Sequence, residues 1–115
     1  MGETIFSKII RKEIPAAVVY ETDSVLAFKD INPQAPVHIL IIPKKIIDKI
    51  HNFDTRSDSE LLAELFQAAQ QIAEEHGLSK NGYRLVINNG NDGGQEVEHL
   101  HLHLLGGRKM NWPPG

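Results

Sequence analysis

The chain has 115 residues, of which 41% are hydrophobic and 23% charged, as expected for one soluble globular domain over residues 1–115. Its net charge of −3 argues against a nucleic-acid-binding protein, because such proteins usually have a basic face. The chain lacks cysteine, which excludes disulfides and thiolate metal sites, and no apolar run approaches the roughly 20 residues of a membrane span. We therefore expect a cytoplasmic protein with no nucleic-acid or membrane partner.

The first part of the chain predicts a short helix followed by three strands. The helix should end before Pro15, because proline cannot continue it. The run that ends at Pro43 is almost wholly apolar and predicts a central strand buried on both faces. We expect the helix at residues 7–13 and two strands, 18–21 and 24–29, on either side of a turn. A loop rich in turn residues over 30–36 then leads to the buried strand at 37–42.

A long amphipathic helix is predicted in the middle of the chain. The segment 57–60 has the form of a capping box, with Ser57 as the N-cap. Apolar residues then recur at three- and four-residue spacing up to Ala73, which is typical of a helix with one buried face. Gly77 is expected to end the helix.

The C-terminal part predicts two further strands. The first spans residues 83–88, and a loop too rich in glycine for regular structure follows over residues 89–95. The last strand is expected from Val97 to Leu105, ending at Gly106. Strands before and after one long helix predict an α+β fold with a mainly antiparallel sheet.

Three histidines alternate with leucines near the end of the chain, at positions 99, 101 and 103. On a strand this alternation places all three imidazoles on one face, with about 6.6 Å between neighbouring positions. Three interpretations are open. The row could be a solvated polar face, or part of a metal site completed by His38 or a carboxylate from elsewhere. It could also supply a neutral, nucleophilic imidazole that attacks phosphorus, with Gly93 and Gly94 offering backbone donors nearby.

The segment His99–Leu105 matches the alternating histidine signature of the histidine-triad (HIT) superfamily. Residues 28–38, Gly106-Gly107-Arg108 and the tail 111–115 resemble the histidine-triad nucleotide-binding (HINT) branch. The resemblance therefore covers nearly the whole chain. It implies the HIT fold, with one long helix and a short N-terminal helix, and a homodimer formed by joined sheets and packed helices.

The resemblance implies a hydrolase that acts at the α-phosphate of purine nucleotides, typically on phosphoramidates in which AMP or GMP is joined to an amine. His101 would be the nucleophile and form a nucleotidyl-histidine intermediate, with His99, His103 and His38 completing a histidine relay. Members need no metal for turnover, although some have been associated with zinc, so we expect no required cofactor and at most adventitious zinc.

The same resemblance implies the residues that bind the nucleotide. Asp30 would bind the ribose, Phe28 and Ile31 would line the base pocket, and the C-terminal segment with Trp112 would reach the partner subunit's site. The remaining candidates, which belong to the phosphate end, are His101, His103, Asn88, Gly94, Gln95 and Glu96.

Glu96 departs from the family pattern, because many animal members have a serine that contacts the phosphate and the leaving group at this position. An ionised carboxylate would repel phosphate unless it turned away or became protonated. Two alternatives to the phosphoramidate hydrolase stay open. One is a nucleotide- or partner-binding protein with incidental hydrolysis, and the other is a dinucleoside polyphosphate hydrolase.

Overall fold

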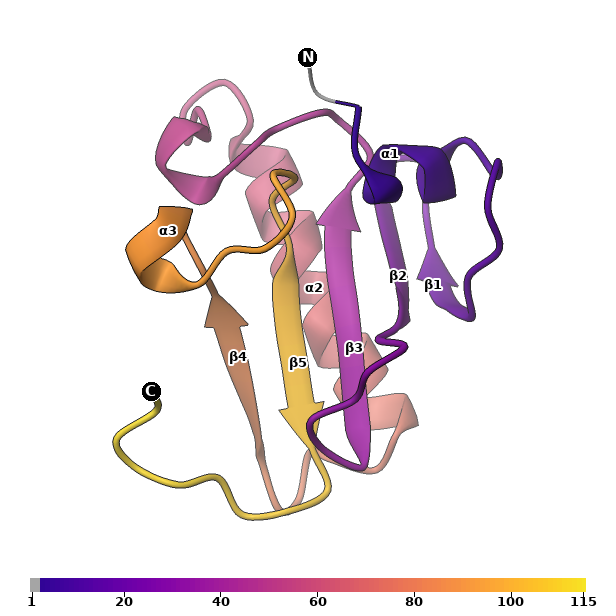
Figure 1. Cartoon of the computed structure of the whole chain (residues 1–115). Coiled ribbons are helices and arrows are strands. Elements are labelled where there is room, and N and C mark those ends of the chain that lie inside the picture. The colour runs from indigo at the N-terminus through magenta and orange to yellow at the C-terminus, as the bar shows by residue number, and fades with distance from the viewer. Residues whose placement is uncertain (1–2) are drawn as a thin grey trace.

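The computed structural model describes residues 3–115 as a five-stranded antiparallel sheet with helices on both faces (Figure 1). The strand order is β1-β2-β3-β5-β4, so β3 is central and β1 and β4 are the edges. The elements are α1 (Ile5–Ile10), β1 (Val18–Glu21), β2 (Val25–Lys29), β3 (Val37–Pro43), η1 (Ile50–Asn52), α2 (Ser59–Glu75), β4 (Tyr83–Ile87), α3 (Gly90–Gly93) and β5 (Leu102–Gly106). Within residues 3–115 no helix has the length and apolar character needed to cross a membrane.

The two faces of the sheet bury different side chains. Alternate residues of β3 point to opposite faces, so Ile39 and Ile41 pack beneath α2 while Leu40 and Ile42 pack beneath α1. The α2 core also contains three leucines at two-residue spacing, Leu100, Leu102 and Leu104. The predicted α+β class, the buried central strand and the alternation of the leucines are therefore confirmed.

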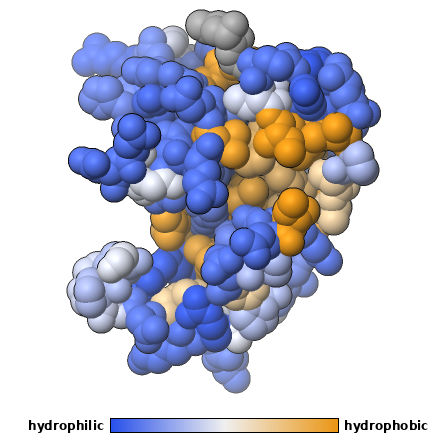
Figure 2. Space-filling view, in the orientation of Figure 1, coloured by the Kyte–Doolittle hydropathy of each residue, from blue (hydrophilic) through white to orange (hydrophobic). Residues whose placement is uncertain are grey.

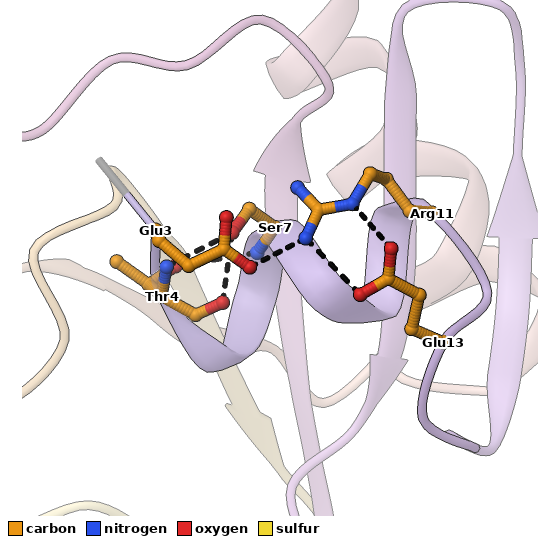
Figure 3. A network of polar contacts seen from close by, with 5 residues as sticks. All are labelled: Glu3, Thr4, Ser7, Arg11 and Glu13. Carbon is orange, nitrogen blue, oxygen red and sulfur yellow. Dashed lines mark hydrogen bonds and ion pairs between the residues drawn. The ribbon is translucent and has the colours of Figure 1, made fainter. Parts of the chain in front are cut away.

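The N-terminal helix begins earlier than predicted, at Ile5 rather than Ser7, and ends at Ile10 rather than Glu13. A capping box explains the start: the Thr4 side chain accepts the Ser7 N–H, and the Ser7 hydroxyl accepts the Thr4 N–H (Figure 3). After the helix, Arg11 contacts the carboxylates of Glu3 and Glu13, which ties both flanks of α1 together (Figure 3).

The predicted capping box of the long helix is wrong. The N-cap position is Asp58, one residue after Ser57, and no side chain caps it. Asp54 instead accepts the N–H groups of Arg56 and Ser57, so the preceding turn takes those donors before the helix begins. The predicted end is confirmed, since Gly77 follows the helix with a φ of +70°, which favours glycine.

Two predictions about the C-terminal part are also corrected. The glycine-rich loop contains a helical turn, α3, because Gly90 and Gly94 adopt the positive φ values that begin and end it. The last strand starts at Leu102, not at Val97. Before it, the Leu100 N–H donates to the carbonyl of Ile47 rather than to a neighbouring strand, so this stretch leaves the sheet while its leucines stay in the core.

Candidate active site

A cleft of about 570 Å³ opens on the α1 face of the sheet. Figure 2 shows hydrophobic side chains gathered on this face, with hydrophilic surface around them. Two residues of the histidine row, His101 and His103, line the cleft together with His38 of β3. A larger cleft of about 760 Å³ lies beside the C-terminal segment, but its only histidine is His76. The histidine-lined cleft is therefore the candidate site.

One end of the cleft is apolar. The predicted base-pocket residues Phe28 and Ile31 both line it, Phe28 from the core and Ile31 almost fully exposed. Sequence reasoning missed residues of this wall beyond α1, such as Ile14 and Val97, as well as the part that α1 supplies through Ile5, Phe6 and Ile9. Their three- and four-residue spacing marks an apolar helix face, but nothing in the sequence says which surface that face covers.

His101 lies at the polar end with its ring orientation fixed. Its Nδ1–H donates to the carbonyl of His99 at 2.7 Å, so the lone pair of the neutral ring is on Nε2. The Phe6 ring packs edge-on against it, with centroids 5.1 Å apart. Among residues 3–115 only His99 Nδ1 is a buried side-chain nitrogen or oxygen without a partner. His101 Nε2 also forms no hydrogen bond there, so it must be open to the cleft.

His38 and His103 form a directed pair. The Gln34 N–H donates to His38 Nδ1 at 3.0 Å, so the proton of neutral His38 must be on Nε2. That Nε2–H points at His103 Nδ1, and the two nitrogens are 2.9 Å apart. Asp30 Oδ2 lies 3.5 Å from His38 Nε2. His103 Nδ1 is thus an acceptor, and the Nε2 of neutral His103 carries a proton that no group in residues 3–115 accepts.

Burial keeps this pair neutral. Desolvation, reinforced by the nearby His101 and His38, lowers the pKa of His103 to about 4. Burial also lowers the pKa of His38, although the Asp30 carboxylate opposes the effect. The neutral His103 ring therefore presents an N–H donor to the cleft beside the His101 ring, with the two ring centroids 4.9 Å apart.

His99, predicted to flank the nucleophile, does not line the cleft. It is fully buried, and its Nε2–H donates to the carbonyl of Pro43 at the end of β3. Burial lowers the pKa of His99, although that hydrogen bond opposes the effect. Its carbonyl, not its ring, contacts His101. His99 is therefore placed as an anchor between two segments of the chain.

The predicted phosphate residues divide into two groups. Asn88, Gly94 and Glu96 line the cleft, whereas Gln95 does not. The Gln95 amide braces the loop instead, donating to the carbonyls of Asp48 and Val97 and accepting the Gly90 N–H. The Gly94 N–H donates to the Asn91 carbonyl within the α3 turn, so this N–H already has a hydrogen-bond acceptor within the protein.

Trp112 lies outside the cleft of its own chain and is 82% exposed. Arg84 holds the segment in place: its guanidinium donates to the Asn111 carbonyl and lies 6.0 Å from the centre of the indole. A large apolar side chain held in solvent in this way is available to a second molecule.

Asp30, His38 and His103 also form a group that could hold a metal, with ligand atoms within 4.8 Å of one another. Two of the separations, 2.9 and 3.5 Å, are close to the roughly 3.3 Å between neighbouring ligands of tetrahedral zinc. The ring of His38 does not suit this use, however. A ligating histidine usually donates its other N–H to an acceptor, whereas His38 Nδ1 accepts from Gln34. The fit to a resident metal is therefore poor, although zinc could bind if that contact were lost.

The comparisons with known proteins agree with this geometry. Residues 11–110 match the HIT domain family. The chain is 56% identical to a 14 kDa zinc-binding protein of Zea mays, across 97% of this chain and 88% of that protein. The crystal structure of a HIT family hydrolase from Legionella pneumophila superposes with a TM-score of 0.95 at 57% identity, covering 98% of this chain and 100% of its own.

A histidine triad nucleotide-binding protein from Candida albicans superposes with a TM-score of 0.83 at 33% identity, covering 96% of this chain and 83% of its own. The chain therefore belongs to the HIT domain family, and its α+β fold is the HIT fold.

Proposed function

We propose that this protein is a purine nucleoside phosphoramidate hydrolase of the HINT branch, acting through a nucleotidyl-histidine intermediate on His101. The observation that carries the proposal is the hydrogen bond from His101 Nδ1–H to the His99 carbonyl. In the neutral ring this bond leaves the lone pair on Nε2, which faces an open cleft, and that is the form in which histidine is a nucleophile. The names of the Legionella and Candida relatives support hydrolysis and nucleotide binding respectively.

The two ends of the cleft suit the two ends of a nucleotide. A volume of about 570 Å³ is in the range of small-molecule sites. The apolar wall of Phe6, Phe28 and Ile31 would hold a purine. Asp30 directly precedes Ile31, and its carboxylate would accept hydrogen bonds from ribose hydroxyls. The α-phosphate would then lie at the polar end with AMP or GMP derivatives as substrates.

The reaction proceeds in two displacements. His101 Nε2 attacks phosphorus, the P–N bond breaks, and the departing nitrogen takes up a proton from solvent water to leave as an amine. Water then attacks the phosphorus of the nucleotidyl-histidine and returns a proton to solvent, which releases the nucleoside monophosphate and regenerates the neutral ring. His103 Nε2–H, held by His38, donates to a phosphate oxygen where negative charge develops in both steps.

No metal takes part in these steps, and we propose that zinc binding to this chain is adventitious. A zinc ion on Asp30, His38 and His103 would displace the Gln34 N–H from His38 and occupy the Asp30 carboxylate that would bind the ribose. Added zinc should therefore inhibit turnover, and a chelator should not reduce it.

We further propose that the protein forms a homodimer in the cytoplasm. The free edge of β4 and the exposed Phe66 of α2 offer a strand edge and an apolar helix face. The exposed Trp112 would then reach the partner subunit's cleft. Light scattering after size exclusion should give twice the chain mass of 12.9 kDa, and a monomer would contradict this assembly.

The deciding experiment is steady-state hydrolysis of an adenosine phosphoramidate with a neutral amine, by the wild type and by His101→Ala, each with and without EDTA. We expect chelator-resistant turnover in the wild type and a loss of about 10⁴-fold or more in the variant. Mass spectrometry of the quenched wild type should detect the nucleotide adduct on the peptide that contains His101. Tight AMP binding without wild-type turnover would instead indicate a nucleotide-binding protein.

A further inference from the structure

The loop before β3 is held from outside the cleft by the two residues that follow β5. Arg108 donates from both Nε and Nη2 to the carbonyl of Gln34, at 3.3 and 3.0 Å. Gly107 adopts a φ of +92°, and a Cβ there would come within 2.8 Å of Pro36. The loop is thus fixed by a hydrogen-bonded fork at one residue and by close backbone packing at another. We call this contact of Gly107 and Arg108 with Gln34 and Pro36 the latch.

The latch holds the residue that decides the tautomer of His38. Gln34 presents its carbonyl to Arg108 and its N–H to His38 Nδ1, so one residue is bound on both sides. Because Nδ1 accepts this proton, His38 can hold its own proton only on Nε2, and His103 must receive that donation on Nδ1. The chain of contacts runs from Arg108 through Gln34 and His38 to the His103 Nε2–H in the cleft.

Reversing the direction of proton donation between His38 and His103 would change the chemistry of the site. If Gln34 moved away, His38 could carry its proton on Nδ1, and its Nε2 would become an acceptor. His103 would then have to donate from Nδ1 to avoid two facing lone pairs, which would leave a lone pair on its own Nε2. A phosphate oxygen at that position would meet an acceptor instead of a donor.

We propose that Arg108 is a positioning residue that sets the direction of donation in the His38–His103 pair by fixing Gln34. It touches neither of these rings and acts only through the loop. The consequence for turnover rests on the function proposed above, whereas the consequence for the tautomer does not.

The test compares Arg108→Gln with Lys109→Gln. Lys109 is the next residue, is exposed, and its ammonium has no hydrogen-bond or ion-pair partner in the described part of the chain, so its variant controls for the lost charge. In the free protein, ¹⁵N NMR of the histidine rings should show His38 as the Nε2–H tautomer in the wild type and in Lys109→Gln. In Arg108→Gln a second population with the proton on Nδ1 should appear. Arg108→Lys, which can still donate to the carbonyl, should restore part of the wild-type population.

The kinetic readout separates this role from a purely structural one. Arg108→Gln should lower kcat about three- to tenfold, the effect of one net hydrogen bond, with a smaller change in KM. An unchanged His38 tautomer in a folded Arg108→Gln protein would overturn the proposal. So would a defect confined to KM, because the latch would then serve only the loop that carries Asp30. Should the wild type not turn over, the proposed function fails while the NMR result still decides the role of Arg108.

Discussion

The two ends of the histidine row have the same spacing but are held in different ways. His103 lies in β5, between β3 and β4, where two strand ladders fix its backbone. His99 and His101 precede the strand. Their segment is held by hydrogen bonds of their own side chains and by one long-range backbone hydrogen bond, from Leu100 to Ile47. The regular end presents a donor to the cleft. The irregular end turns the His99 ring inward as an anchor and the His101 ring into the cleft, where we propose that it acts as the nucleophile.

The difference teaches that equal spacing does not give equal roles. On a paired strand all three rings would point into the same cleft, and none would be free to cross to the end of β3. Because the chain leaves the sheet before Leu102, the His99 ring reaches the Pro43 carbonyl, and the His99 carbonyl reaches the His101 ring. Variants of the individual histidines should separate the catalytic from the structural contribution.

The largest effect after the loss of the nucleophile is expected for His103→Ala. The variant lacks the Nε2–H that is proposed to donate to the phosphate, and removal of one such donor typically costs about 10²–10³-fold in kcat. Stopped-flow or steady-state kinetics with the adenosine phosphoramidate would measure it. If kcat stayed within threefold of the wild type, His103 would not stabilise developing charge, and the assignment of roles along the row would be wrong.

His99→Ala should show the opposite balance. The ring is fully buried and donates to Pro43, so its removal leaves a cavity and an unpaired carbonyl, and we expect a loss of about 2–4 kcal/mol in the free energy of unfolding. Because the variant keeps the backbone carbonyl that holds His101, kcat measured well below its melting temperature should fall less than in His103→Ala. Urea unfolding supplies the stability. If His99→Ala were as stable as the wild type but as inactive as His103→Ala, the His99 ring itself would act in catalysis.

Stability should also fall in mild acid. The folded state lowers the pKa of His103 to about 4, below the ordinary value of about 6.5, so between these values the unfolded chain binds more protons than the folded one. The free energy of unfolding should therefore decrease as the pH falls from about 6.5 to about 4, by at most about 1.4 kcal/mol for each pKa unit. Urea unfolding in EDTA-containing buffers, with His103→Asn beside the exposed His51→Gln, would measure the contribution. The slope should be smaller in His103→Asn and unchanged in His51→Gln.

Much of this arrangement could be predicted from local pattern. The apolar run 37–42 gave the central strand, the stripe ending at Ala73 gave the long helix, and the alternation near the C-terminus gave the leucine face and two of the cleft histidines. In each case the side-chain type itself carries the information, because burial of apolar surface decides where such residues lie.

The rest depends on partners that are distant in sequence or on backbone groups. The start of β5 is set by a bond to the Ile47 carbonyl, and the tautomer of His38 is set by the Gln34 N–H. Every non-proline residue has these groups, so no side-chain pattern marks the ones that are used. The apolar face of α1 was visible in the sequence, but its position over the cleft follows from packing against Phe28 and His101.

The smallest expected effect concerns Glu96, which belongs to the irregular segment before β5. Its carboxylate lines the cleft and has no ion-pair or hydrogen-bond partner within residues 3–115. It should therefore repel a bound phosphate weakly, since both charges are in contact with solvent. Glu96→Gln should bind AMP about two- to fivefold more tightly in calorimetry at low ionic strength, with the gain shrinking as salt is added. The matched control is Glu98→Gln, whose exposed carboxylate lies 3.6 Å from Lys49 and outside the cleft, and which should leave AMP affinity unchanged. Weaker binding by Glu96→Gln would show that the irregular segment contributes a favourable contact through this carboxylate, and the division of roles between the two ends of the row would have to include it.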